Sequence, residues 1–136
     1  MSQWYTFGDC KCDYAHGDDK WPSNQAPVWM EELGDILHRM LGIDTDKPDS
    51  CNCNMYPEST SSLGWHSDNE TLFVKNHGKA TIISFSLGAA RVFEFRRKNL
   101  TNSGPPPQFC SLGHFDVSAM MGKMQLFFEH RVPQVH

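Results

Sequence analysis

The spacing of apolar residues changes along this chain, and the first pattern is helical. Between Pro27 and Gly42, apolar residues recur three or four positions apart, at Leu33, Ile36, Leu37, Met40 and Leu41. Such spacing places them on one side of a helix. Proline suits the first position of a helix, and glycine is a common stop. The pattern therefore predicts one helix between Pro27 and Gly42.

After this helix the period falls to two, which is typical of strands. Strands are predicted at 51–56, 80–88, 91–97, 108–112, 116–121 and 126–132. In the strand 91–97, Phe93 and Phe95 face one way and Glu94 and Arg96 the other. The proline-rich segment 102–108 cannot join a sheet. A helix followed by many short strands predicts a mainly β (α+β) fold, a sandwich or jelly roll with the helix packed outside.

The remaining segments carry no clear period. Residues 1–26 mix glycine, aspartate, proline and aromatic residues, and we expect them to be irregular. Residues 44–49 are a polar connection. A length of 136 residues suits one domain with a modest core. We therefore predict a single domain over 1–136, with an N-terminal part (1–48) and a β-rich part (49–136).

The amino-acid composition indicates in which cellular compartment the protein resides and which partners it could have. No apolar run approaches the roughly 18 residues of a membrane span, and the N-terminus lacks the basic and apolar regions of a secretory signal. The number of cysteines is odd, and four of them form two C-x-C pairs, a spacing strained for a disulfide. We expect reduced thiols, an intracellular (nuclear or cytoplasmic) protein, no membrane partner and a monomer. A zinc site of Cys10, Cys12, Cys51 and Cys53 is an alternative, although structural zinc sites prefer wider spacing.

Charge is uneven along the chain, although the net charge is only −4. Up to Glu70 there are 13 acidic and 4 basic residues, and from Thr71 there are 3 acidic and 8 basic ones. A uniformly acidic protein binds nucleic acid poorly, but the second half of this chain could present a basic face. The alternative is that the charges are scattered over solvated surfaces.

The stretch GWHSDNE contains the most informative pair of polar residues. In an extended segment His66 and Asp68 point to the same side and could bind one ion. Two histidines and one carboxylate form the facial triad of non-haem iron(II) oxygenases. His130 is the best third ligand, because it lies in the apolar strand 126–132, where an unpaired imidazole is costly to bury. A surface turn for the first pair and a satisfied core histidine for His130 are the alternatives.

Five segments together resemble the AlkB family of iron(II)- and 2-oxoglutarate-dependent dioxygenases. In order along the chain they are NMY (54–56), GWHSDNETLF (64–73), IISFSLGAARVFEFR (82–96), LGHFDVSAMMG (112–122) and HRVP (130–133). The opening YTFGDCKCDY (5–14) is similar to the family's N-terminal substrate lid. The resemblance implies a double-stranded β-helix (jelly roll) whose open end holds the iron.

The resemblance also assigns roles. It makes His66, Asp68 and His130 the iron ligands and catalytic centre, and it makes Asn54 and Tyr56 contacts to the co-substrate. The cofactors would be Fe(II), 2-oxoglutarate and O2. The reaction would remove an N-alkyl group from a nucleic-acid base and release an aldehyde, succinate and carbon dioxide. For Tyr56, an ordinary aromatic residue at a strand end is the alternative.

Alkylated DNA or RNA is therefore the expected substrate. An enzyme acting on a base takes it out of the stack, and aromatic and cationic side chains assist. The candidates are Glu70, Tyr14, Trp65, Arg91 and Arg96. The alternatives are a plain surface residue for Glu70 and a solvated hairpin face for the arginines.

One departure from the family pattern leaves other functions open. The family continues with a strand whose arginine clamps the distal carboxylate of 2-oxoglutarate, whereas this chain ends at His136. We expect the C-terminal strand to be missing and co-substrate affinity to be weak without that arginine. The alternatives are a non-catalytic or vestigial binding domain, an oxygenase acting on a protein or small molecule, and a zinc hydrolase.

Overall fold

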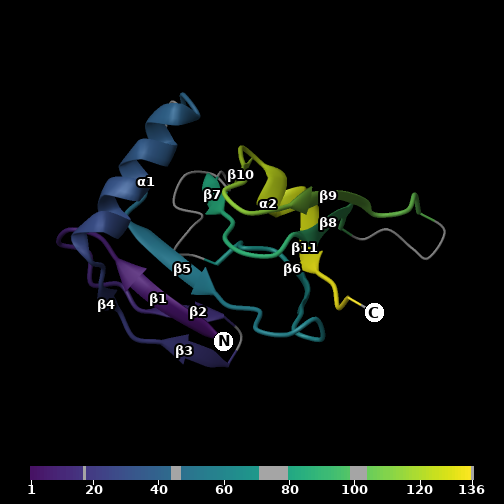
Figure 1. The fold of residues 1–136 in the computed structure, drawn as a ribbon, viewed down its shortest axis with the longest axis horizontal. Helices are drawn as coiled ribbons and strands as arrows, with labels where there is room; N and C mark the ends of the chain where they lie inside the picture. The colour runs from purple at the N-terminus through teal and green to yellow at the C-terminus, as the bar shows by residue number, and fades with distance from the viewer. Residues whose placement is uncertain (17, 44–46, 71–79, 99–103, 136) are drawn as a thin grey trace. The chain divides into compact units, whose positions relative to one another are not determined.

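The computed structural model describes residues 1–16, 18–43, 47–70, 80–98 and 104–135. Within them the chain is mainly β, with eleven strands and two helices (Figure 1). The described residues form two compact units, Met1–Met55 and Tyr56–His136. The single domain over 1–136 stays a prediction. The expected polar connection 44–49 and proline-rich loop 102–108 lie partly outside the described residues.

The first unit is built on a sheet of three strands in the order β4-β1-β5. Strand β1 (Ser2–Thr6) pairs antiparallel with β5 (Ser50–Asn54) and parallel with β4 (Asn24–Gln25). The sequence prediction of an irregular segment 1–26 is wrong, because it lacked this partner. Ser2 and Asn54 are 52 positions apart in the chain. Pairing over that distance leaves no local signal in a strand with few apolar residues.

Stacked aromatic rings provide the core of the first unit. Strands β2 (Tyr14–His16) and β3 (Asp19–Trp21) form an antiparallel pair. The Tyr14 ring lies between the rings of Trp4 and Trp21, with centroids 5.0 and 5.2 Å away. Trp4 is 2% exposed, and its indole N–H donates a hydrogen bond of 2.7 Å to the Cys12 carbonyl. The stack therefore ties the hairpin to β1.

Helix α1 (Val28–Met40) confirms the predicted helix. Pro27 is its N-cap, and Gly42 follows its C-terminal end with a φ of 58°, a conformation that glycine tolerates best. The buried residues of this helix are Met30 and Leu37, whereas Ile36 is exposed. The spacing therefore predicted the helix correctly but only part of its buried face.

The second unit contains two antiparallel sheets. A four-stranded sheet has the order β6-β11-β8-β9, and a two-stranded sheet pairs β10 with β7. The bounds are β6 Leu63–His66, β7 Ile82–Phe85, β8 Arg91–Arg97, β9 Gln108–Leu112, β10 Val117–Met120 and β11 Phe128–Val132. Strands β8 and β9 match the predicted ranges, β7 and β10 lie inside theirs, and β5 begins one residue before its predicted range and ends two residues before the end of it.

The last strand differs from its prediction at one end. We expected it to begin at residue 126, but the short helix α2 (Met124–Phe127) precedes β11. Leu126 and Phe127 are exposed, so their apolar character does not mark a buried strand. This turn of helix instead buries Gln125, the residue before Leu126, at 1% exposure.

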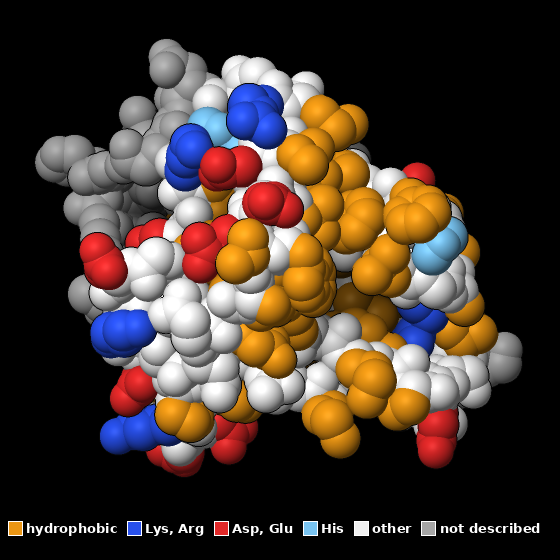
Figure 2. Space-filling view, turned by 60° about the vertical axis from the view of Figure 1, so that its left-hand side comes forward, with side chains coloured by type: hydrophobic (Ala, Val, Ile, Leu, Met, Phe, Trp, Pro, Cys, Tyr) orange, Lys and Arg blue, Asp and Glu red, His pale blue; other side chains and the backbone are white. Residues whose placement is uncertain are grey.

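Many large hydrophobic side chains remain exposed on the described residues. Orange side chains cover much of the face in Figure 2, while acidic and basic ones are interspersed with one another. Val28, Met40 and Phe109 are each more than 70% exposed. Exposed apolar surface favours association, so the expected monomer stays a prediction. Among the described residues, no helix is long and apolar enough to cross a membrane.

Candidate metal centre

The pairing of β6 with β11 brings two histidines together. His66 at the end of β6 lies directly opposite His130 of β11, and their ring centroids are 4.2 Å apart. His66 Nδ1 lies 2.8 Å from the Gly64 carbonyl oxygen. A carbonyl can only accept a hydrogen bond, so Nδ1 carries the proton and Nε2 keeps its lone pair. This is the tautomer that a metal ligand needs.

Asp68 follows β6 and is held by two hydrogen bonds to the other side of the site. Its backbone N–H donates to Gln125 Oε1 at 3.0 Å, and the adjacent Ser67 hydroxyl donates to the Phe128 carbonyl at 3.0 Å. The segment after β6 is therefore fixed against α2 and β11. The Asp68 carboxylate lies 3.7 Å from His66 Nε2 and 3.4 Å from His130 Nε2.

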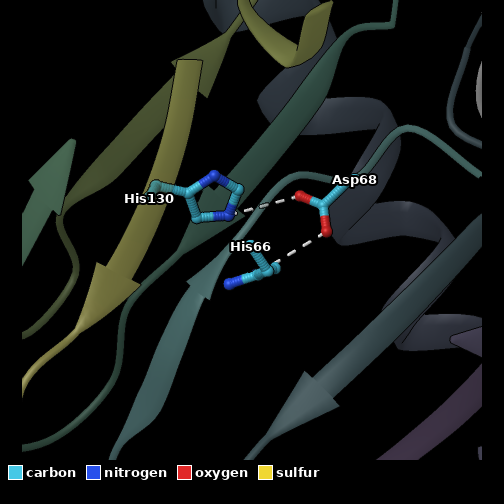
Figure 3. Close-up of side chains that lie close together, drawn as sticks. All are labelled: His66, Asp68 and His130. Atoms are coloured by element: carbon cyan, nitrogen blue, oxygen red, sulfur yellow. Dashed lines mark ion pairs between the residues drawn. The ribbon is translucent and has the colours of Figure 1, made fainter. Parts of the chain in front are cut away.

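His130 occupies the middle of β11 and is 5% exposed. Its ring stacks on Phe93 of the neighbouring β8, with centroids 5.2 Å apart. Figure 3 shows the two imidazoles and the carboxylate turned toward one another from β6, β11 and the segment after β6. One ligand atom from each residue lies within 4.8 Å of the others. The structure thus brings together the three residues that the sequence predicted as ligands.

These donors fit an iron(II) ion. Two imidazole nitrogens and one carboxylate oxygen are the donor set of a facial triad, which leaves coordination positions open. Ligands about 2.1 Å from an ion are about 3 Å apart, so the observed separations require only small side-chain movements. Among the described residues this is the only group of three or more potential ligands. The alternative zinc site of Cys10, Cys12, Cys51 and Cys53 is therefore wrong, because those thiols do not converge.

Comparison with known proteins identifies the family. A family model described as the 2OG-Fe(II) oxygenase superfamily matches residues 2–136. The chain belongs to this superfamily. The cofactors predicted from the sequence, Fe(II), 2-oxoglutarate and O2, are those of the superfamily, and the predicted dioxygenase class is confirmed.

Curated relatives in this superfamily carry the name alpha-ketoglutarate-dependent dioxygenase alkB homolog 3. The mouse protein is 31% identical and the human protein 32% identical, each over 120 residues. Each match covers 79% of this chain but only 38% of the relative. The bovine protein is 35% identical over 94 residues, which are 60% of this chain and 29% of the relative. The predicted resemblance to the AlkB family is confirmed by these oxygenases.

Tyr56 begins the second unit and lies beside Arg91. The guanidinium carbon of Arg91 is 5.4 Å from the centre of the Tyr56 ring. Arg91 Nη2 donates hydrogen bonds of 2.7 Å to the carbonyls of Ser61 and Pro133. Burial raises the pKa of the Tyr56 hydroxyl, and the charge of Arg91 opposes that rise. Tyr56 therefore stays a neutral phenol at physiological pH, and Arg91 links the segment around Ser61 to the segment that follows β11.

Two other predicted substrate contacts lie on the opposite face of the sheet from the triad. Because side chains alternate along a strand, Trp65 of β6 points away from His66. The guanidinium carbons of Arg96 and Arg131 lie 4.1 and 4.6 Å from the Trp65 ring centre. Arg96 pairs with Glu129 at 2.6 Å, and Arg131 pairs with Glu94. The charges of both arginines are thus offset locally, and contact of Trp65 and Arg96 with nucleic acid stays a prediction.

The remaining predicted site residues belong to other surroundings. Asn54 ends β5 in the first unit, where the Ser2 hydroxyl donates to its Oδ1 at 2.6 Å. Tyr14 is 7% exposed within the aromatic stack of the same unit. Glu70 is half-buried at the end of a described segment. The structure does not test their predicted roles, so these stay predictions.

Gln125 is a positioning residue that the sequence did not reveal. A lone polar residue between Met124 and Leu126 gives no signal, but the structure buries it beneath the triad segment. Replacing Gln125 by alanine removes the acceptor for the Asp68 N–H and leaves a cavity. We expect iron(II) affinity to fall about tenfold while the ligand set is retained. Titration of apo protein with iron(II) measures this.

Control variants distinguish a positioning role of Gln125 from a general loss of protein stability. Gln108 is an exposed glutamine in β9 of the same unit, so Gln108→Ala should leave the affinity unchanged. Gln125→Met restores volume without the acceptor and should still bind iron weakly. Full affinity in that variant would show that Gln125 only fills space.

Proposed function

We infer that this chain is an oxidative N-dealkylase of nucleic-acid bases, acting on alkylated DNA or RNA. The observation that carries the proposal is the convergence of His66, Asp68 and His130 in a chain similar to AlkB-type oxygenases. The sheets β6-β11-β8-β9 and β10-β7 are proposed to form the two halves of a double-stranded β-helix. Their antiparallel pairing and the position of the triad on the first sheet support this fold.

The tautomer of His66 and the charge of Asp68 suit the binding of a cation. The Gly64 carbonyl holds His66 in the tautomer whose Nε2 carries the lone pair that a metal ligand needs. Asp68 places a negative charge between the two imidazoles, which offsets the charge of the cation. Phe93 holds the His130 ring by stacking and excludes water from one side of it. When bound, iron(II) with 2-oxoglutarate and dioxygen supplies the oxidation of an N-alkyl carbon.

Tyr56 and Arg91 are proposed to support the co-substrate. A neutral phenol can donate a hydrogen bond to a carboxylate, and the raised pKa of Tyr56 keeps its proton in place. The Arg91 charge beside it suits an anionic ligand. The predicted role of Asn54 as a co-substrate contact stays part of the proposal. The predicted contacts to the substrate strand, Glu70, Tyr14, Trp65, Arg91 and Arg96, stay part of the proposal.

The decisive experiment measures turnover with defined substrates. Purified chain is supplied with iron(II), 2-oxoglutarate and air, and succinate and formaldehyde are measured with a single-stranded oligonucleotide that carries N-methylated bases. We expect both products to form only with the methylated strand. The unmethylated strand of the same sequence and the His66→Ala variant are the controls.

Other outcomes favour the other functions. Turnover with an N-methylated peptide but not with the oligonucleotide would replace the nucleic-acid substrate by a protein. If 2-oxoglutarate and iron bind but no substrate releases succinate, the chain is a binding domain. If neither binds, the catalytic proposal fails for this chain.

A further inference from the structure

The first unit holds a pair of thiols that the oxygenase site does not use. Cys51 and Cys53 are two residues apart in β5, so their side chains lie on the same side of the strand. Their Sγ atoms are 3.8 Å apart, close to van der Waals contact. Both residues are half-buried, so each keeps part of its surface exposed. Among the residues that the structure describes, β5 is at the edge of its sheet and pairs only with β1.

The contact between the two sulfurs shifts the pKa values of the two thiols in opposite directions. The hydrogen bond with Cys51 lowers the pKa of the Cys53 thiol to about 7, although burial opposes this shift. The same hydrogen bond raises the pKa of Cys51, and burial adds to the rise. Near neutral pH the pair thus holds one thiolate and one thiol that share a proton. A thiolate next to a second thiol is the arrangement of redox-sensitive cysteines.

We propose that Cys51 and Cys53 form a peroxide-reactive dithiol, in which Cys53 attacks the peroxide and Cys51 resolves the product. The Cys53 thiolate attacks one oxygen of hydrogen peroxide, so that an S–O bond forms and the O–O bond breaks. The sulfur loses two electrons to the peroxide, and the leaving hydroxide takes up a proton to give water. Cys53 is then a sulfenic acid.

The second step closes the disulfide. Cys51 gives up its proton and attacks the Cys53 sulfur, so that the S–S bond forms and the S–O bond breaks. Hydroxide leaves with that proton as a second water. The balance is two thiols and one hydrogen peroxide converted to one disulfide and two waters. No further oxidant or reductant is needed.

The position of β5 makes this disulfide possible but strained. Two residues in an extended strand span about 6.6 Å, near the upper limit for bridged cysteines. The sulfurs must close from 3.8 Å to about 2.05 Å. An edge strand can bend more easily than a central one, because one side of its backbone is unpaired. A strained disulfide is easily reduced, so we expect the oxidation to be reversible.

The test measures which thiols react. The full chain, with metal removed by a chelator, is treated with one equivalent of hydrogen peroxide, and the remaining thiols are alkylated. Peptide mass spectrometry should show a Cys51–Cys53 disulfide, and the free thiols should fall from five to three. Dithiothreitol should restore all of them. The reaction at neutral pH should be about tenfold faster than that of a short peptide with an ordinary cysteine.

Variants distinguish the two roles. Cys51→Ser should stop at a sulfenic acid on Cys53 that dimedone traps, and Cys53→Ser should abolish the fast reaction. Cys12→Ser is the matched control, because Cys10 and Cys12 have the same spacing but lie outside any strand among the described residues. It should leave the oxidation of Cys51 and Cys53 unchanged. Circular dichroism checks that each variant is folded.

The pH dependence provides a separate readout. Alkylation of Cys53 by iodoacetamide should be slow below pH 7 and reach half its maximal rate near pH 7, because only the thiolate reacts. In Cys51→Ala, which removes the hydrogen bond that lowers the pKa of Cys53, the midpoint should move to higher pH. Equal oxidation of Cys10, Cys12 or Cys110, or a rate no faster than that of the free peptide, would overturn the proposal.

Discussion

Replacing His66 by alanine is expected to abolish iron(II) binding by this chain. His66 supplies one of three donors, and its Nε2 lies 3.7 Å from the Asp68 carboxylate. Loss of a residue that merely supports a metal ligand weakens binding by about 10- to 100-fold, and loss of a ligand should exceed that. Anaerobic titration with iron(II) and 2-oxoglutarate, followed by visible absorption, measures the effect. The charge-transfer band of the chelated 2-oxo acid should appear in the wild type and be absent in the variant.

The control is a histidine outside the triad, and a second readout guards against misfolding. His38 lies on α1 in the other unit, so His38→Ala should keep the band. Manganese(II) should raise the melting temperature of the wild type, because a ligand that binds only the folded state stabilises it. The same ion should leave His66→Ala unchanged. If the His66→Ala band has the wild-type intensity, the three residues are not the metal centre.

The sequence predicted what is local or carried by a motif. Helix α1 and strand β8 followed from spacing, because their apolar residues recur at the period of a helix and of a strand. His66 and His130 were predicted from residue type and resemblance. The structure adds that they lie directly opposite each other on adjacent strands.

The features that the sequence did not predict depend on contacts between segments that are distant in the chain. Strand β1 forms because β5 pairs with it, and Gln125 acts because α2 turns it toward Asp68. The Asp68 N–H and Gln125 are 57 positions apart. The face of Trp65 also depends on pairing, since its neighbours Arg96 and Arg131 come from β8 and β11. The order of residues along the chain does not indicate which distant segments pair in this way.

Replacing Trp4 by alanine is expected to have the largest effect on stability. Trp4 is 2% exposed, stacks on Tyr14 and donates to the Cys12 carbonyl. Truncating a buried tryptophan costs about 3–5 kcal/mol through lost burial and the remaining cavity. Folded domains are stable by only about 5–15 kcal/mol. The free energy of unfolding in urea, followed by circular dichroism, should therefore fall by a large part of its total.

Two further variants separate the contributions of this side chain. Trp4→Phe keeps an aromatic ring against Tyr14 but loses the hydrogen bond of 2.7 Å, so it should cost clearly less than alanine. Trp29 on α1 is 60% exposed, and Trp29→Ala should change the free energy of unfolding by no more than about 0.5 kcal/mol. Because the described chain forms two compact units, the Trp4 effect should be confined to the transition of residues 1–55 if they unfold separately. Equal losses for Trp4→Ala and Trp29→Ala would contradict a core built on the Trp4–Tyr14–Trp21 stack.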